Sequence, residues 1–322
     1  MFLVTGGAGF IGSNLVAALE AKGAEVAVCD RLGHDDKWRN LAKRELADLF
    51  SPERLADWLK GRKLDGIYHM GAISTTTETD ADLILSQNFS ASLDLWNWCT
   101  EAKVPLVYAS SAATYGDGAA GFDDDQSPEA LARLQPLNAY GWSKHLFDRR
   151  AVRLAAAGHR PPRWAGLKFF NVYGPNEYHK GSQLSVAWQI HQRVKAGEPA
   201  RLFKSYEPKY PDGGQLRDFV WVGDCVDVAL WAGEHSSGIF NVGSGEARSF
   251  ADLAKAVFRA SNREPQITFV DMPEAMRDRY QYFTRSNPEK LRRAGYARPF
   301  TQLEDGVGRY VRDYLIKQDP YL

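Results

Sequence analysis

The sequence predicts an α/β fold, a doubly wound parallel sheet flanked by helices, with a smaller mixed α/β C-terminal lobe. Three observations support this prediction. The chain opens with an apolar run at 2–4 that breaks into a glycine turn and then becomes a helical pattern. Short β-rich runs then alternate with longer helical patterns, which is the order that βαβ units produce. No repeat, low-complexity tract or flexible linker interrupts the 322 residues, so we expect two lobes that share an interface.

The glycine turn has the spacing of a dinucleotide-binding motif. The matching glycines are Gly6 or Gly7, Gly9 and Gly12. Because glycine has no Cβ, backbone N–H groups in such a turn can approach a pyrophosphate at the start of the helix. A helical pattern from Phe10 to Lys22 follows, and the next β-rich run, 25–29, ends in Asp30. An acid about 20 residues beyond the glycines meets the adenosine ribose in this motif. The order of strand, glycines, helix, strand and acid therefore predicts a Rossmann-type dinucleotide-binding domain.

The choice between NAD and NADP depends on the residues around Asp30. An acid at this point is associated with NAD, whereas a nearby arginine accommodates the 2'-phosphate of NADP. Arg31 follows directly and Lys37 comes soon after, so the chain carries both signals. We predict NADP, with NAD as the alternative. Further cofactor contacts are expected in the turn, at the ends of later strands and at a polar interruption of one helix: Phe10, Ile11, Met70, Gly71, Ala72, Ser74, Asn88 and Val172.

Composition and charge argue against several classes of function. Lys plus Arg equals Asp plus Glu, at 40 each, so no overall positive field draws the chain to nucleic acid. No stretch approaches the ~18 to 20 apolar residues that span a bilayer, and the first residues lack the basic region of a signal peptide. The cysteines Cys29, Cys99 and Cys225 lie far apart in apolar patterns, which is typical of buried thiols in a reducing cytoplasm. We expect a cytoplasmic protein without metal, nucleic-acid or membrane partners.

The remaining elements are predicted from apolar patterns and their flanking residues. Ser51 and Pro52 suit the cap and the first position of a helix. His69 is expected to pack within a strand, Asp123–Asp125 to form a solvated loop, and Lys168 to be a solvent or rim charge. The other predicted elements are strands at 66–69, 106–110 and 266–270, and helices at 82–102, from 138 onward, at 249–261, at 287–295 and at 303–316.

Hydroxyl and amine groups collect where the strand at 106–110 ends and a later helix begins. Ser111 follows that strand, while Tyr140 and Lys144 are four residues apart and share one face of their helix. A phenol has a pKa near ~10 and is a poor base at neutral pH, but a nearby ammonium favours the phenolate. We therefore predict that Tyr140 moves a proton of a substrate group that Ser111 holds. Lys144 is expected to lower the pKa of the phenol and to bind the nicotinamide ribose.

These features together resemble the extended short-chain dehydrogenase/reductase family, the NAD-dependent epimerases and dehydratases, over the whole chain. Two later segments, 167–175 and 217–224, resemble the family's substrate signatures. Three more, 110–116, 179–182 and 279–281, are similar to those of the members that invert C6 of an ADP-bound heptose. The resemblance implies an isomerase that oxidises a nucleotide sugar, ADP-heptose in this group, and returns the hydride to the other face. It also implies a role in supplying lipopolysaccharide core precursors and a homo-oligomer, a pentamer in this group.

Such an inversion needs two proton-transfer groups, because one base cannot sit on both faces of a carbonyl. The resemblance nominates Tyr140 and Lys180. A guanidinium such as that of Arg217 can hold a diphosphate through two hydrogen bonds. The substrate contacts that the resemblance implies are Ser111, Asn171, Ser182, Leu202, Phe203, Arg217 and Tyr280.

The chain departs from this group at two places on the expected substrate side. Gln189 stands where the group has a histidine, and we count it among the substrate contacts. Residues 205–214 are an insert rich in Pro, Gly and Tyr, which predicts an ordered surface loop or a lid. Both departures leave the oxidation chemistry alone but leave the sugar and the base open.

The active site is expected between two lobes. We predict an NADP-binding domain at 1–170 plus about 217–245, and a substrate lobe at about 171–216 plus 246–322. Two other functions stay open. A UDP-sugar 4-epimerase of the same family would not need Lys180, and a catalytically silent dinucleotide-binding sensor would commonly lack the tyrosine or lysine that is present here. A 4,6-dehydratase is disfavoured, since Ala112 and Ala113 stand where it would have an Asp-Glu pair.

Overall fold

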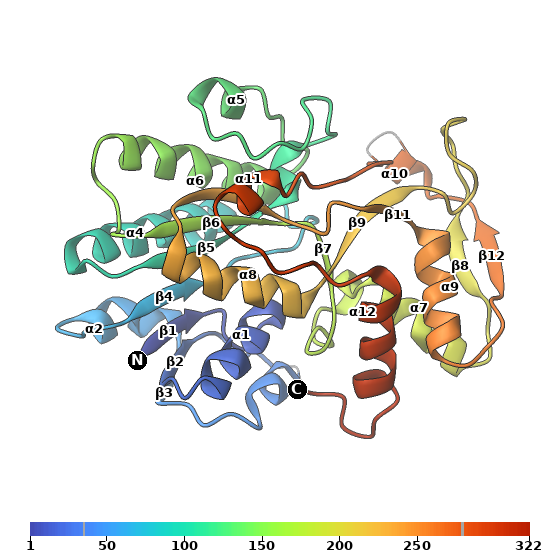
Figure 1. Ribbon diagram of the computed structural model, residues 1–322, viewed down its shortest axis with the longest axis horizontal. Helices are drawn as coiled ribbons and strands as arrows, with labels where there is room; N and C mark the ends of the chain where they lie inside the picture. The colour runs from blue at the N-terminus through green and yellow to red at the C-terminus, as the bar shows by residue number, and fades with distance from the viewer. Residues whose placement is uncertain (35, 278–279) are drawn as a thin grey trace.

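A seven-stranded parallel sheet forms the centre of the molecule (Figure 1). The computed structural model describes residues 1–34, 36–277 and 280–322. The strands lie in the order β10-β6-β5-β4-β1-β2-β3, and each neighbouring pair is parallel. Their bounds are β1 Phe2–Thr5, β2 Val26–Cys29, β3 Asp48–Phe50, β4 Gly66–His69, β5 Leu106–Ser111, β6 Trp164–Phe169 and β10 Gly238–Val242. The winding direction changes between β1 and β4, which is where open α/β sheets bind ligands. The predicted doubly wound α/β fold is confirmed.

Alternating side chains of the strands build an apolar layer on each face of this sheet. Val4 packs in a cluster with Leu15, whereas its neighbour Leu3 packs in another cluster with Trp96. Because both faces are covered, the strands are apolar almost throughout. The long helices that flank the sheet are α1 Phe10–Ala21, α4 Ala91–Ala102, α6 Ala139–Ala156 and α8 Val222–His235.

A second lobe, on the right of Figure 1, holds two small sheets and its own apolar core. The first sheet has the order β11-β9-β7 and the second pairs β12 with β8. The helix predicted at 249–261 is confirmed as α9, and Ser249 and Asp252 form reciprocal hydrogen bonds at its start. The elements are β7 Asn171–Tyr173, α7 Val186–Lys195, β8 Ala200–Phe203, β9 Leu216–Trp221, β11 Ala247–Ser249, α9 Phe250–Ala260, β12 Ile267–Val270 and α12 Leu303–Arg309. The lobe boundaries stay a prediction, but β9 pairs with β7 and β11 and so belongs to the smaller sheet.

Two predicted helices contain a wider, π-helical turn. The helix predicted at 82–102 consists of α3 Ala81–Ile84, the π-helical η3 Leu85–Ser90 and α4. The helix predicted at 303–316 consists of α12 and the π-helical η6 Tyr310–Leu315. Short helices and turns complete the chain: η1 Asp36–Leu41, η2 Pro52–Arg54, α2 Leu55–Leu59, η4 Ala112–Tyr115, α5 Pro128–Ala132, η5 Gly181–Gln183, α10 Glu274–Arg277 and α11 Glu289–Arg293.

Two predictions about charged residues are wrong. Lys168 is not a rim charge: it lies in β6, is 1 % exposed, and its Nζ is 3.8 Å from an oxygen of Asp148. Asp124 is not solvated either, because it is 5 % exposed and accepts a hydrogen bond from the backbone N of Asn241 at 2.8 Å. The partners, Asp148 and Asn241, are distant in sequence from Lys168 and Asp124, so no local sequence pattern predicts these contacts. The prediction for His69 is confirmed, since it is buried in β4 and its Nδ1 is 2.6 Å from Oγ1 of Thr5.

Other expectations from composition can be compared with the described residues. The three cysteines are buried free thiols, as predicted. Across 1–34, 36–277 and 280–322, none of the helices combines the length and apolar character that a membrane span requires. In the same ranges we find no cluster of three or more His, Cys, Asp or Glu side chains suited to a metal ion.

Candidate active site

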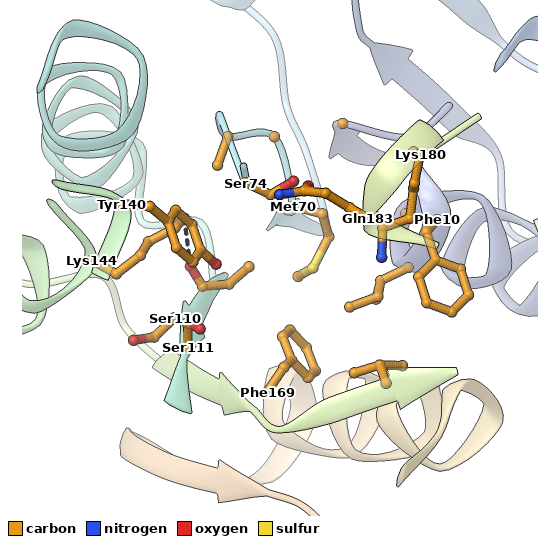
Figure 2. Close-up of a pocket in the computed structure, with 18 of the residues that line it drawn as sticks. Phe10, Met70, Ser74, Ser110, Ser111, Tyr140, Lys144, Phe169, Lys180 and Gln183 are labelled. Carbon is orange, nitrogen blue, oxygen red and sulfur yellow. Dashed lines mark hydrogen bonds between the residues drawn. The ribbon is translucent and has the colours of Figure 1, made fainter. Parts of the chain in front are cut away.

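A cavity of about 540 Å³ opens at the carboxyl ends of β1, β4, β5 and β6. All four predicted catalytic residues line it, namely Ser111, Tyr140, Lys144 and Lys180. The predicted cofactor residues that line it are Gly6, Gly9, Phe10, Ile11, Gly12, Asp30, Lys37, Met70, Gly71, Ala72, Ser74 and Val172. In Figure 2, Tyr140, Lys144 and Ser111 gather on one side of the cavity, and Lys180, Gln183 and Phe10 lie on the other. The structure therefore brings the predicted cofactor and catalytic residues to one place.

The glycine turn is too tight for any side chain. A Cβ on Gly12 would lie 2.1 Å from the carbonyl oxygen of Gly6, and a Cβ on Gly6, whose φ is +66°, would lie 2.5 Å from the backbone N of Gly71. The cap residue of α1, Gly9, makes no side-chain hydrogen bond, so it does not occupy the first N–H groups of the helix. Free N–H groups at a helix start bind phosphate. The turn thus fits the pyrophosphate of a dinucleotide.

One of the two predicted cations, Lys37, contacts the acid that was predicted to meet the ribose, whereas the guanidinium of the other, Arg31, pairs with Glu53. Oδ1 of Asp30 accepts a hydrogen bond from Nζ of Lys37 at 2.6 Å, and its Oδ2 accepts one from the backbone N of Ala8 at 2.8 Å. Arg31 does not line the main cavity. It borders a neighbouring cavity of about 400 Å³, and its guanidinium donates to Glu53 and to Gln87. The positive charge of Lys37 therefore neutralises the carboxylate of Asp30. An acid that only binds a ribose hydroxyl does not need such a partner.

Asn88 lies behind the cavity wall and does not line the cavity. Its Oδ1 accepts from the backbone N of Ile73 at 2.8 Å, and its Nδ2 donates to the carbonyl oxygen of Ile73 at 2.9 Å and to Oγ of Ser143 at 3.0 Å. These three bonds attach the loop at 71–74 to α6. Asn88 thus supports this loop instead of lining the cavity, and the sequence did not indicate that its amide would be fully engaged.

The predicted catalytic trio is assembled by β5 and α6. The α6 helix begins where the side chain of Asn138 accepts from the backbone N of Gly141. Tyr140 and Ser111 are hydrogen-bonded, and Nζ of Lys144 donates to the carbonyl oxygen of Ala109 at 2.8 Å. Phenol, hydroxyl and ammonium are thus held at the end of one strand, which suits proton transfer to a bound hydroxyl or carbonyl.

The electrostatics of this trio correct one sequence prediction. Burial raises the pKa of Tyr140, while its hydrogen bond with Ser111 acts in the opposite direction. Burial lowers the pKa of Lys144 to about 8, opposed by the charge of Asp148. Lys144 was expected to pull the pKa of the phenol down, but its ammonium is directed at the Ala109 carbonyl and the net shift of Tyr140 is upward.

Lys180 enters the cavity from the loop that follows β7. Its Nζ lies 5.1 Å from the centroid of the Phe10 ring. Burial lowers the pKa of Lys180, and the carboxylate of Glu177 opposes that shift. An amine whose pKa is reduced exchanges a proton near neutral pH more readily than an exposed lysine. The cavity thus has an ionisable side chain, Tyr140 or Lys180, on each of two facing sides.

The neighbouring residues of this loop differ from the sequence prediction. Ser182 is exposed and does not line the cavity, whereas Gln183, the next residue, does. His179 also lines the cavity. Gln189 is exposed on α7, and its Nε2 donates to the carbonyl oxygen of Leu184 at 2.8 Å. The segment 179–182 gave a signal for this turn, but a short 3₁₀ turn decides which of its residues face inward.

The other predicted substrate residues form a second group outside the main cavity. Arg217 is 8 % exposed, and its guanidinium lies 5.3 Å from the ring of Tyr280 and 5.6 Å from that of Phe250. Its one hydrogen bond goes to the carbonyl oxygen of Leu216, and no carboxylate of residues 1–34, 36–277 or 280–322 forms an ion pair with it. A buried cation with that little compensation suits an anionic ligand.

The other predicted substrate residues differ in whether their side chains are free to contact a ligand. The rings of Phe203 and Tyr280 are 6.3 Å apart in an edge-on arrangement. Leu202 precedes Phe203 on β8 and is buried in the apolar core, so its side chain faces away from a ligand. Asn171 is exposed at the start of β7, where its Oδ1 accepts from Oγ1 of Thr284 at 3.4 Å.

The family model of the NAD dependent epimerase/dehydratase family matches residues 2–243. The chain belongs to this family. A relative named ADP-L-glycero-D-manno-heptose-6-epimerase, from Nitratidesulfovibrio vulgaris, is 48 % identical, with all of both chains covered. The crystal structure of the enzyme of that name from Helicobacter pylori is 28 % identical, with a TM-score of 0.80 over 97 % of this chain and 95 % of that one.

Another solved structure bears on the cofactor. The UDP-glucose 4-epimerase of Thermus thermophilus, solved with NAD, is 28 % identical, with a TM-score of 0.76 over 96 % of this chain and 97 % of that one. Together with the family, this supports a nicotinamide dinucleotide cofactor for the chain, and the glycine turn beside the cavity fits its pyrophosphate.

Proposed function

We propose that this protein inverts C6 of ADP-D-glycero-D-manno-heptose to give ADP-L-glycero-D-manno-heptose, by transient oxidation and re-reduction with a bound NADP. One observation supports this proposal above the others. Tyr140 and Lys180 line one cavity from two sides, beside the glycine turn (Figure 2). A reaction that ends with inverted configuration needs a proton-transfer group on each face of the carbonyl. The full-length relative that carries the heptose-epimerase name supports the same substrate.

Four residues of the chain have separate roles in the proposed inversion. Ser111 holds the C6 oxygen by hydrogen bonding while Tyr140 takes its proton, and Lys144 donates to the nicotinamide ribose. A nicotinamide dinucleotide held beside these residues would supply reversible hydride transfer at C6. Lys180 exchanges a proton with the same oxygen once the carbonyl has turned its other face to the cofactor. Tyr140 and Lys180 therefore share one proton, which changes sides in each turnover.

The nucleotide end of the substrate is assigned to the group around Arg217. Its guanidinium is buried against two aromatic rings and has no described counter-charge, so a diphosphate supplies the missing anion. Asn171 and Tyr280 border the same group by β-strand pairing and ring contact. Gln183, which faces the cavity beside Lys180, is added as a contact to the sugar.

The preference for NADP rests on the cations around Asp30. Nζ of Lys37 donates both to Asp30 and to the carbonyl oxygen of Arg31, at 2.6 and 3.0 Å. Its charge therefore lies where the 2'-position of the ribose is expected, with the Arg31 guanidinium bordering the next cavity. A 2'-phosphate is compatible with two cations, whereas a bare 2'-hydroxyl needs only the acid. A homo-oligomer, a pentamer by resemblance, and a cytoplasmic location stay predictions.

The test combines the bound cofactor with the reaction. Mass spectrometry of the nucleotide released from the purified protein is expected to show NADP. Incubation with ADP-D-glycero-β-D-manno-heptose, followed by separation of the C6 epimers, is expected to give a mixture of both without net reduction. No conversion by a cofactor-loaded protein would move the assignment to another nucleotide sugar, and no turnover of any nucleotide sugar would support the silent sensor.

A variant separates the heptose epimerase from a 4-epimerase. Lys180→Ala is expected to abolish C6 inversion, because one of the two proton-transfer groups is lost. The matched control is Lys63→Ala, which removes an exposed lysine far from the cavity lining. Retained activity of Lys180→Ala toward a UDP-sugar would favour the 4-epimerase.

A further inference from the structure

The loop that carries Lys180 contains a second buried ionisable group, Glu177. Its side chain is 0 % exposed, and the backbone N of Lys180 donates to its carbonyl oxygen at 3.0 Å, so the two residues share one turn. The carboxylate accepts three hydrogen bonds, from the backbone N of Ser185 at 2.5 Å, from Oγ of Ser185 at 2.6 Å and from the hydroxyl of Tyr310 at 2.8 Å. A buried carboxylate is costly unless it is bonded in this way.

These three bonds attach the loop to two elements of the second lobe. Ser185 is the cap of α7, where its Oγ accepts from the backbone N of Trp188, and Tyr310 opens the π-helical η6. The carboxylate thus fixes the catalytic loop relative to both elements. A neutral side chain of the same shape would retain part of this attachment but would remove the negative charge.

The charged groups around Lys180 leave Glu177 as its main counter-charge. On its own loop, Lys180 is near Glu177 and His179. Burial lowers the pKa of His179 to about 4, so this ring is neutral at neutral pH. On the cofactor side, Lys37 and Asp30 pair with each other, and the Phe10 ring against Lys180 is uncharged.

We propose that Glu177 is a positioning residue for proton transfer at Lys180: its carboxylate fixes the loop that carries the amine and places a negative charge beside it. This inference rests on the proposed function, in which Lys180 is one of two groups that share a proton. Glu177 does not touch the substrate; it sets where the amine stands and how readily the amine keeps its proton.

The negative charge of Glu177 is expected to shift the pH dependence of kcat in a definite direction. Burial raises the pKa of Tyr140 and lowers that of Lys180, so both shifts favour Lys180 as the deprotonated member of the pair. Activity requires that one of the pair is deprotonated, so the acid arm of the kcat profile reports Lys180. The negative charge of Glu177 holds the pKa of Lys180 up. Removing it moves that arm to lower pH.

The experiment compares Glu177→Gln with Tyr310→Phe. In Glu177→Gln we expect a loss of kcat of about 10- to 100-fold from misplacement of the amine, and an acid arm shifted down by roughly 1 pH unit. Tyr310→Phe removes one hydrogen bond to the carboxylate but keeps its charge, so a smaller loss of kcat without a shifted arm is expected. Retention of the bound nucleotide checks that both variants are folded.

A measurement without substrate separates this inference from the proposed function. The pH dependence of acylation of Lys180 by an amine-selective reagent, read on its peptide by mass spectrometry, gives the pKa of the amine directly. In Glu177→Gln the midpoint is expected at lower pH than in the unmodified sequence. An unchanged midpoint would overturn the inference and leave Glu177 with a structural role alone, the attachment of its loop to Ser185 and Tyr310, even if ADP-heptose is the substrate. A shifted midpoint with no C6 inversion would overturn the proposed function instead.

Discussion

Lys144 is a buried ammonium whose visible partner is the carbonyl oxygen of Ala109, at 2.8 Å. Burial lowers its pKa to about 8, so the group is charged below that pH and neutral above it. In the proposed function Lys144 also donates to a ribose hydroxyl, and loss of its positive charge would weaken both hydrogen bonds. The alkaline side of the activity profile therefore belongs to Lys144 rather than to Tyr140, whose pKa burial raises.

We predict that kcat falls as the pH rises through about 8, because Lys144 loses its proton there. Lys144→Arg keeps a charge throughout the measurable range, so its alkaline arm is expected at higher pH, although the bulkier side chain lowers the rate. Initial rates of C6 inversion would be measured for both proteins between pH 6 and 10. This range extends about two units on each side of that pKa. The same alkaline arm in Lys144→Arg would show that another group titrates there.

At the scale of the element, α6 joins the catalytic residues to a buried ion pair. Tyr140, Lys144 and Asp148 are spaced by four residues, so they lie along one face of the helix. The carboxylate of Asp148 accepts from Oγ of Ser110 at 2.7 Å and from the hydroxyl of Tyr108 at 3.0 Å, and it faces Lys168 at 3.8 Å. This network fixes the end of β5 that presents Ser111.

Replacing Lys168 by methionine leaves the carboxylate of Asp148 buried without its cation. Removal of one partner of a buried pair costs about 3 to 5 kcal/mol of the free energy of unfolding. Burial already raises the pKa of Asp148, and loss of Lys168 raises it further. When an acid has a raised pKa in the folded state, the folded protein becomes less stable as the pH rises through that pKa. The loss of unfolding free energy in Lys168→Met is therefore largest at neutral pH and smaller near pH 4, about the ordinary pKa of Asp.

Urea unfolding of Lys168→Met at several pH values measures this cost. The double variant Lys168→Met with Asp148→Asn is the control, since it removes both charges and is expected to recover part of the lost stability. A cost that does not change between about pH 4 and pH 7 would show that packing, and not the charge of Asp148, is responsible.

Sequence patterns predicted the elements well where the signal is local. The glycine turn, the helix starts at 138 and 249 and the apolar strand runs each depend on residues within a few positions of one another. The π-helical turn at 85–90 was missed because one extra residue in a turn hardly disturbs an apolar pattern. Lys168 was misjudged because its partner, Asp148, lies on a different element.

The site shows the same division between local and distant causes. The resemblance places Lys180 in its loop, but only the fold shows that Gln183 and not Ser182 turns into the cavity. Asn88 was recognised as an unusual polar residue on a helix, yet its role depends on Ile73 and Ser143, to which it is bonded. The type of a residue indicates which chemistry its side chain can perform, whereas tertiary contacts decide where that side chain points.

At the scale of the whole molecule, buried asparagines tie the Lys180 loop to the cofactor turn. Nδ2 of Asn40 donates to the carbonyl oxygen of Ala8 at 2.9 Å and to that of Asn176 at 3.0 Å. Nδ2 of Asn14 donates to the carbonyl oxygen of Pro175, also at 3.0 Å. Asn176 itself is fully buried with a φ of +71°, a conformation that needs such support. The loop that carries Lys180 is thus attached to the glycine turn and to α1 by buried amide groups.

We predict that Asn40→Ala lowers both stability and turnover, because one amide connects the glycine turn to the loop of the second proton-transfer group. Leaving the buried carbonyl groups of Ala8 and Asn176 unpaired costs about 1 to 3 kcal/mol each at most. Lys180 then moves relative to the cofactor, and kcat is expected to fall by about 10-fold or more. Asn287→Ala is the control, since Asn287 is exposed and its amide bonds Asp123 at the surface. Urea unfolding and the rate of C6 inversion would be measured on both variants. A destabilised Asn40→Ala protein with an unchanged rate would show that Lys180 is positioned from its own lobe, through Glu177 and Tyr310, and needs no connection to the cofactor turn.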